Sequence, residues 1–215
     1  MTESNPSKAP PPANSVHDES GGDAADDQLL GVARHLFAAL GYDEVSTQMI
    51  SDAAGVDPGT VTERYGGKRD LYLAAMQRTT DEWLVEQELI TSRFTPDADG
   101  LFFLFDRLLV HCLEHPELPR LWQHRRLSDA SDITDLEERN YARMVPQTLA
   151  LVRSAVRPDV DAEVALWTVS WSIMCYAQAG LPTPQGMRRP PNDPAMLSRM
   201  RAHLRWHVRT MARQD

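Results

Sequence analysis

The sequence is poor in cysteine and has no long apolar run. Its 215 residues include two cysteines, Cys112 and Cys175, each inside an apolar helical pattern that predicts a buried, reduced thiol rather than a disulfide. No run of 18 apolar residues occurs, and no basic segment followed by an apolar one stands at the N-terminus. We therefore expect a cytoplasmic protein with neither a membrane span nor a secretory signal, and no membrane partner.

Sequence motifs of enzymes are also missing. The chain contains no glycine-rich phosphate loop, no nucleophile elbow and no paired CxxC motif. His111 and His115, and again His203 and His207, stand four residues apart, a spacing that places each pair on one helical face and could hold a metal. A third ligand is not evident for either pair, so exposed or interface histidines are favoured. We expect no enzymatic activity, no metal and no other cofactor.

The segment 29–65 shows the pattern of three helices, the last two of them short. Its first part has apolar residues at helical spacing, so one face can be buried. Ser46 suits the N-cap of a second helix, and Gly55 can end that helix in the left-handed conformation. Asp57 followed by Pro58 predicts a third helix that runs to about residue 65. Two short helices around a glycine turn, behind a packing helix, describe a helix-turn-helix.

This segment resembles the DNA-binding domain of the TetR family of transcriptional regulators. The resemblance rests on residues in matching order and spacing: Gly41-Tyr42, Ser46-Thr47, Ile50, Ala53-Ala54-Gly55-Val56, Gly59-Thr60, Tyr65, Lys68 and Leu71. It implies an all-α fold, with an N-terminal three-helix DNA-binding domain and a C-terminal helical bundle for effector binding and dimerisation. It does not cover the C-terminal two thirds, and Thr62 stands where the family usually has an aromatic side chain.

The resemblance also implies which residues contact DNA. The third helix would approach base edges in the major groove, and residues at the starts of the second and fourth helices would bind phosphates. A homodimer would present two such helices to a palindromic, double-stranded operator. The expected DNA-binding residues are Thr47, Gln48, Pro58, Gly59, Thr60, Thr62, Arg64 and Lys68, whereas Val61 and Tyr65 are expected to point inward.

Positive charge is scarce for a DNA-binding protein. The net charge is −9, and residues 26–76 hold four Lys and Arg against eight Asp and Glu. Arg64, Lys68 and Arg69 nevertheless cluster where the phosphates would lie. Residues 185–215 hold seven Arg and two acids, which favours surface arginines that pair with a partner subunit over a second DNA-binding patch.

The rest of the chain is predicted to be helical, apart from its N-terminus. Residues 1–25 contain many prolines and glycines and little apolar surface, which predicts a disordered arm. We expect the DNA-binding domain over 26–72 and the effector-binding and dimerisation domain over 73–215. Pro146 predicts a kink or a split in its helix. After a long helix to about residue 92, helices are expected near 98–114, 117–128, 132–156, 160–180 and 193–213, with a loop over 182–191.

Apolar stripes on the last two helices could simply close the core of the monomer. The resemblance instead favours a four-helix bundle between two copies, with an interface at Val164, Trp171, Met174, Met200, Leu204 and Val208. The middle helices are rich in aromatic and methionine side chains, which predicts a pocket for a hydrophobic or aromatic small molecule. Its expected lining is Phe105, Leu108, His111, Trp122, Tyr141, Met144 and Trp167.

Two functions remain open from the sequence. One is a ligand-responsive transcriptional regulator, expected to be a repressor that leaves its operator when a small-molecule effector binds. The other is a helix-turn-helix-bearing interaction protein whose DNA binding is weak or lost. The acidic DNA-binding domain and the residues Thr62 and Glu63 favour this alternative.

Overall fold

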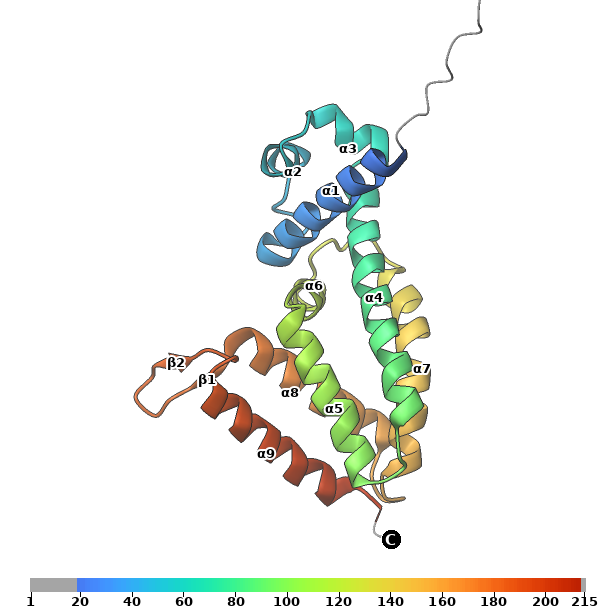
Figure 1. Cartoon of the computed structure of the whole chain (residues 1–215), viewed down its shortest axis with the longest axis vertical. Coiled ribbons are helices and arrows are strands. Elements are labelled where there is room, and N and C mark those ends of the chain that lie inside the picture. The colour runs from blue at the N-terminus through green and yellow to red at the C-terminus, as the bar shows by residue number, and fades with distance from the viewer. Residues whose placement is uncertain (1–18, 214–215) are drawn as a thin grey trace, which may run out of the picture.

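The computed structural model describes the backbone of residues 19–213 and the side chains of residues 25–213. This part of the chain is all-α apart from one small hairpin, as the sequence predicted (Figure 1). The elements are α1 (Glu19–Leu40), α2 (Thr47–Ala54), α3 (Pro58–Tyr65), α4 (Lys68–Arg93), α5 (Ala98–Glu114), α6 (Glu117–Arg126), α7 (Leu136–Ala155), α8 (Ala162–Ala179), β1 (Leu181–Pro182), β2 (Arg188–Arg189) and α9 (Pro194–Met211).

The first three helices form a small domain at one end of the long helix α4 (Figure 1). Its core is made of fully buried side chains from each helix: Leu29 and Phe37 of α1, Ile50 of α2 and Val61 of α3. Residues from the start of α4 complete this core, among them Tyr72, whose ring meets that of Phe37 edge to face at 5.1 Å. The helix α4 therefore belongs to both halves of the molecule.

The helix α1 begins earlier than the sequence predicted. It starts at Glu19, so residues 19–25 of the expected disordered arm are helical, and residues 1–18 lie outside the described part. Contacts with other helices accompany this extension. Asp26 forms an ion pair with Arg64 of α3, and Asp27 lies 3.2 Å from Arg78 of α4. The sequence did not predict this turn of helix because glycine has a low helix propensity.

The remaining helices form a bundle around α5. α5 packs against α4 on one side and against α8 and α9 on the other, while α7 lies alongside α4 (Figure 1). Buried polar groups join α4 to α7. Thr80 Oγ1 lies 2.5 Å from Asn140 Oδ1, and Gln87 Nε2 donates to the carbonyl of Met144 and to Thr148 Oγ1 at 2.7 and 2.5 Å. These bonds fix the rotation of α4 against α7.

Two local expectations need correction. α7 runs through Pro146 as one helix, so the chain is not split there, and a kink at Pro146 stays a prediction. The predicted loop between α8 and α9 contains a minimal antiparallel pair, β1 and β2, with Leu181 opposite Arg189. A β-carbon on Gly180 would lie 1.9 Å from the carbonyl oxygen of Arg189, so glycine is required at the start of this hairpin. None of the described helices is long and apolar enough to cross a bilayer.

Candidate functional site

Capping interactions fix the turn between α2 and α3. Ser46 Oγ accepts a hydrogen bond from the Met49 amide at 3.1 Å, and Gly55 ends α2 in the left-handed conformation with φ of 69°. The Asp57 carboxylate then accepts from the Gly59 amide at 2.8 Å, and Pro58 is the first residue of α3. These caps confirm the three local predictions and set α3 at a fixed angle to α2.

α3 presents one face to the core and another to solvent. Val61 is fully buried, as predicted, and Tyr65 is half-buried, with its hydroxyl donating to the Asp26 carbonyl at 3.1 Å. The residues predicted to approach bases lie on the opposite side: Pro58, Gly59 and Thr62 are exposed and Thr60 is half-buried. At the start of α2, Thr47 is half-buried, and Gln48 is exposed, with its amide donating to Asp52 at 2.7 Å.

Of the three cations predicted to cluster near the phosphates, Arg64 and Lys68 contact neighbouring groups, and Arg69 is exposed. Arg64, predicted to reach a base or a phosphate, forms an ion pair with Asp26 of α1. The Lys68 ammonium group lies 4.3 Å from the centroid of the Tyr42 ring and 3.4 Å from the Asp43 carbonyl oxygen. Acidic side chains at Asp52, Asp57 and Glu63 are exposed around them. The surface of α2 and α3 is therefore nearly free of net positive charge, which limits its sequence-independent attraction for DNA.

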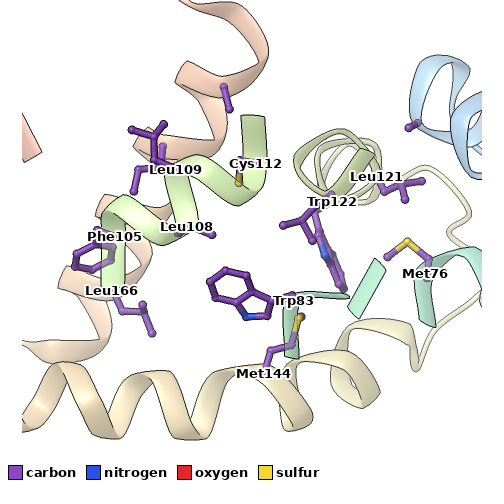
Figure 2. Packing of buried hydrophobic residues seen from close by; sticks show 14 of the residues in the cluster. Met76, Trp83, Phe105, Leu108, Leu109, Cys112, Leu121, Trp122, Met144 and Leu166 are labelled. Carbon is purple, nitrogen blue, oxygen red and sulfur yellow. The ribbon is translucent and has the colours of Figure 1, made fainter. Parts of the chain in front are cut away.

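An inner cavity lies between the middle helices. Its volume is about 70 Å³, and Trp83 of α4, Trp122 of α6 and Met144 of α7 face it (Figure 2). Five of the seven predicted pocket residues line it: Leu108, Trp122, Tyr141, Met144 and Trp167. The sequence did not identify the other lining residues, which are Trp83, Leu104, Leu118, Arg126, Val145, Thr148, Leu166, Ser170 and Met174.

The predicted lining needs correction at two positions, because Phe105 and His111 are buried but do not line the cavity. Within the described residues, His111 Nε2 has no hydrogen-bond partner. Its ring meets Trp83 edge to face at 5.3 Å and lies 4.6 Å from the ring of His115. Burial, together with the nearby His115, lowers the pKa of His111 to about 4, so the side chain is neutral at pH 7.

A surface groove of about 790 Å³ lies between α7 and α8. It shares Arg126, Tyr141, Val145 and Trp167 with the inner cavity, so the two spaces adjoin at these side chains. Pro146 and Trp171 lie further out in the groove. These four side chains form the boundary between the two spaces, which we call the mouth of the inner cavity.

The helix α6 connects this mouth with the N-terminal domain of α1, α2 and α3. Trp122 and Arg126 line the cavity, and the loop that follows α6 carries Asp129. The Asp129 carboxylate accepts hydrogen bonds from the Tyr42 and Asp43 amides, in the turn before α2, at 2.7 and 2.9 Å. Arg125 holds this loop in place. Its guanidinium group binds the Glu137 carboxylate at 2.7 Å and donates to three loop carbonyls, those of Asp129, Ala130 and Ile133.

The predicted dimer interface divides into two groups. Val164 and Trp171 of α8 are exposed, by 61% and 51%, and Met174 is half-buried. Met200, Leu204 and Val208 of α9 are instead buried in the chain's own core, which corrects their assignment to an interface. The exposed side of α9 carries Trp206, which is 61% exposed and was not predicted. Periodicity identified an apolar stripe on α9 but not the helix that covers it.

The two cysteines differ in burial, and the second pair of histidines lies beside a tryptophan. Cys112 is buried as predicted, but Cys175 is exposed on α8. His203 and His207 lie beside Trp206, with ring centroids 5.6 and 6.3 Å from its ring. Within residues 25–213, no group of three or more His, Cys, Asp or Glu side chains is placed to hold a metal ion.

Comparison with known proteins supports the fold of both halves of the molecule. Residues 29–75 match the model of bacterial regulatory proteins of the tetR family. The fold resembles that of a ketosteroid transcriptional regulator of Mycobacterium tuberculosis, with a TM-score of 0.66 and 17% identity over 94% of this chain and 99% of that one. The structure of a TetR family regulator of Marinobacter aquaeolei VT8 gives a TM-score of 0.64 and 20% identity, over 91% of this chain and 100% of that one.

A third solved structure, a TetR regulator of Haloarcula marismortui, gives a TM-score of 0.62 at 18% identity, over 89% of this chain and all of the other. No curated protein sequence matches the chain significantly. At these identities the structural likeness concerns the fold, and it extends over both the N-terminal three-helix domain and the helical bundle.

Proposed function

We propose that this protein is a transcriptional repressor, which a small hydrophobic or aromatic molecule releases from its operator. Its N-terminal domain matches that of TetR-family transcriptional regulators. The observation that carries this proposal is the position of α6. One face of that helix lines the inner cavity through Leu118, Trp122 and Arg126, and the loop after it holds the turn before α2 through Asp129. A ligand that displaces α6 would change the position of the DNA-binding domain.

The operator contacts belong to the proposal. On α3, Pro58, Gly59 and Thr62 are exposed and Thr60 is half-buried beside them, and these four residues would approach base edges. The starts of α2 and α4, with Thr47, Gln48 and Lys68, would bind phosphates, where a helix N-terminus adds partial positive charge. Arg64 would reach DNA only by exchanging Asp26 for a phosphate or a guanine.

A homodimer is the second part of the proposal. Val164, Trp171 and Trp206 place large apolar surface on the outer faces of α8 and α9, which a second copy would cover. A two-fold axis there would bring the two α3 helices to successive major grooves of a palindromic operator. Such a regulator acts on the chromosome and would therefore work in the cytoplasm.

The alternative is an interaction protein with weak or lost DNA binding. The observation in its favour is the acidic surface of α2 and α3, where Asp52, Asp57 and Glu63 are exposed and Arg64 is paired with Asp26. Such a surface repels the phosphate backbone. The two functions differ in one measurable property, the affinity for a specific DNA site.

A mobility-shift assay with DNA from upstream of the chain's own gene separates the two functions. The repressor predicts a discrete complex that persists in excess non-specific DNA and is lost in the Thr60→Ala, Lys68→Ala double variant. Addition of an effector should weaken this complex by about 5-fold to 150-fold, and operator DNA should weaken effector binding by the same factor. A folded wild-type dimer that shifts no fragment of this DNA would favour the interaction protein.

A further inference from the structure

Four aromatic side chains form a continuous wall from the core to the surface of the bundle. Trp122 of α6 stacks on Tyr141 of α7, with ring centroids 4.8 Å apart and an interplanar angle of 26°. Tyr141 lies 5.4 Å from Trp167 of α8, which in turn stacks on Trp171 at 5.9 Å. Trp122 is buried, Tyr141 and Trp167 are half-buried, and Trp171 is exposed. The wall therefore follows the path from the inner cavity into the outer groove.

Arg126 lies beside this wall at the mouth of the cavity. Of the described residues that line the inner cavity, it alone is charged, and it also lines the outer groove. Its neighbour Arg125 is occupied by Glu137 and by loop carbonyls, whereas Arg126 makes no hydrogen bond or ion pair with any described residue. The other charges of the groove are Arg153 and Glu163, which have opposite signs. The unbalanced charge at this site is therefore the guanidinium group of Arg126.

We propose that the ligand of this site is an amphipathic organic anion, with a flat, ring-containing apolar body and one carboxylate. The body lies against the wall of Trp122, Tyr141 and Trp167, where ring stacking is favourable. The carboxylate binds Arg126, whose planar guanidinium group matches it in a bidentate geometry. This inference rests on the proposed function, because it takes the cavity as the effector site, and it adds the charge and the chemical class of the effector.

The volumes decide where such a ligand lies. The inner cavity, at about 70 Å³, is smaller than the roughly 300 Å³ of the smallest usual ligand sites. The adjoining groove of about 790 Å³ can hold a ring system. The inner end of the ligand enters by displacing the flexible side chains of Met144 and Met174, which line the cavity. Because Arg126 and Trp122 are both on α6, a ligand held by both acts directly on the helix that leads to Asp129.

The experiment compares two fluorescent probes with the same ring skeleton and different charge. Anilinonaphthalenesulfonate is an anion, and phenylnaphthylamine is its neutral counterpart. Both are titrated into the full-length protein, and binding is followed by tryptophan-sensitised emission, since Trp83, Trp122, Trp167 and Trp171 line the two spaces. The variant is Arg126→Gln. The matched control is Arg93→Gln, which removes the same charge from an exposed position at the end of α4, outside both linings.

We expect the wild type to bind the anionic probe about 10-fold more tightly than the neutral one. The Arg126→Gln variant should lose this preference because it binds the anionic probe more weakly and the neutral probe as before. The Arg93→Gln variant should keep the preference. Ser170→Phe fills the inner cavity, and Val145→Trp narrows its mouth. Both variants should bind both probes more weakly, and a cooperative melting transition should show that they are folded. These two substitutions establish that the probes bind at this site.

Two results would overturn the inference, and they differ in what they leave standing. If Arg126→Gln binds the anionic probe as tightly as the wild type, while the filled variants lose both probes, the effector cavity stands and its anion preference is wrong. If neither probe binds the wild type, or if the folded Ser170→Phe and Val145→Trp variants bind both as before, the cavity takes no aromatic ligand. The effector site of the proposed function then fails as well.

Discussion

Leu204 and Trp171 lie on consecutive helices and were predicted to share one interface, yet Leu204 is 2% exposed in the core and Trp171 is 51% exposed. The difference arises because α9 turns its apolar stripe toward α5, whereas α8 leaves two large apolar side chains, Val164 and Trp171, in contact with solvent. The apolar stripe on α9 stabilises the monomer. A partner could contact Trp171 without any change in the fold.

Leu204 and Trp171 should respond differently to a charged substitution. Leu204→Glu should destabilise the fold by several kcal/mol, because the carboxylate has no partner in the core around α5. Trp171→Glu should leave the melting transition within a few degrees of the wild type and dissociate the dimer. Light scattering and thermal melting on both variants measure the two effects. A dimeric Trp171→Glu variant would place the interface elsewhere, and a stable Leu204→Glu variant would contradict the burial argument.

Lys68 should contribute to DNA binding through charge alone. Lys68→Ala should weaken binding to all DNA sequences about equally and reduce the slope of log affinity against log salt by about one. Glu63→Gln, on the exposed side of α3, should act in the opposite direction, because it removes a carboxylate from the surface that faces the phosphates. Titrations of operator and random DNA at several salt concentrations measure both effects. Equal salt slopes for wild type and Lys68→Ala would show that Lys68 does not reach a phosphate.

Asp129 should couple the bundle to the DNA-binding domain. Asp129→Ala removes the acceptor of two hydrogen bonds, which the backbone amides of Tyr42 and Asp43 donate, and should lower the free energy of unfolding by about 1 to 2 kcal/mol. It should also lower the factor by which an effector weakens operator binding, since α6 then loses its bond to the turn before α2. Asp132→Ala, in the same loop and exposed, is the control for charge. An unchanged coupling factor in a folded Asp129→Ala variant would show that the signal takes another path.

His111 should make the protein sensitive to acid. Burial and His115 lower its pKa from 6.5 to about 4, against the smaller opposing effects of Glu86 and Glu82. The unfolded chain therefore takes up a proton between these values that the folded chain does not. The stabilisation is complete above pH 6.5 and is lost as the pH falls toward 4, by about 3 kcal/mol in all.

His111→Gln removes this titrating group. Urea unfolding at a series of pH values from 7 to 4 should then show a smaller loss of stability in the variant than in the wild type. A variant with the same dependence on pH would assign the acid sensitivity to other groups.

The two thiols should differ in reactivity. Burial raises the pKa of Cys112 to about 12, whereas Cys175 is exposed on α8. In the Trp171→Glu variant, in which no second copy should cover α8, a maleimide should label one thiol per folded chain, and Cys175→Ser should abolish that labelling. Both thiols should react in denaturant, which serves as the control. Labelling of Cys112 in the native protein would mean that the core around α5 opens faster than its burial implies.

The sequence by itself determined most of the helices and the helix-turn-helix, but not the start of α1 or the hairpin of β1 and β2. Ser46, Gly55, Asp57 and Pro58 act on residues within a few positions, so their caps and turns could be predicted and are present. The apolar periodicity of the later segments likewise placed α5 to α9 within a few residues of their ends. These features depend on contacts that are local in the chain.

Only the tertiary structure decided which partner each exposed or buried face meets. Asp26 and Arg64 are 38 residues apart, so their ion pair, which changes the expected role of Arg64, has no signal in the local sequence. The same holds for Asp129 and Tyr42, which are 87 residues apart. Periodicity shows that a helix has an apolar face, but the packing of the other helices determines what covers it. For this reason Leu204 is buried in the core, Cys175 faces solvent, and Arg126 lies at the mouth of the cavity.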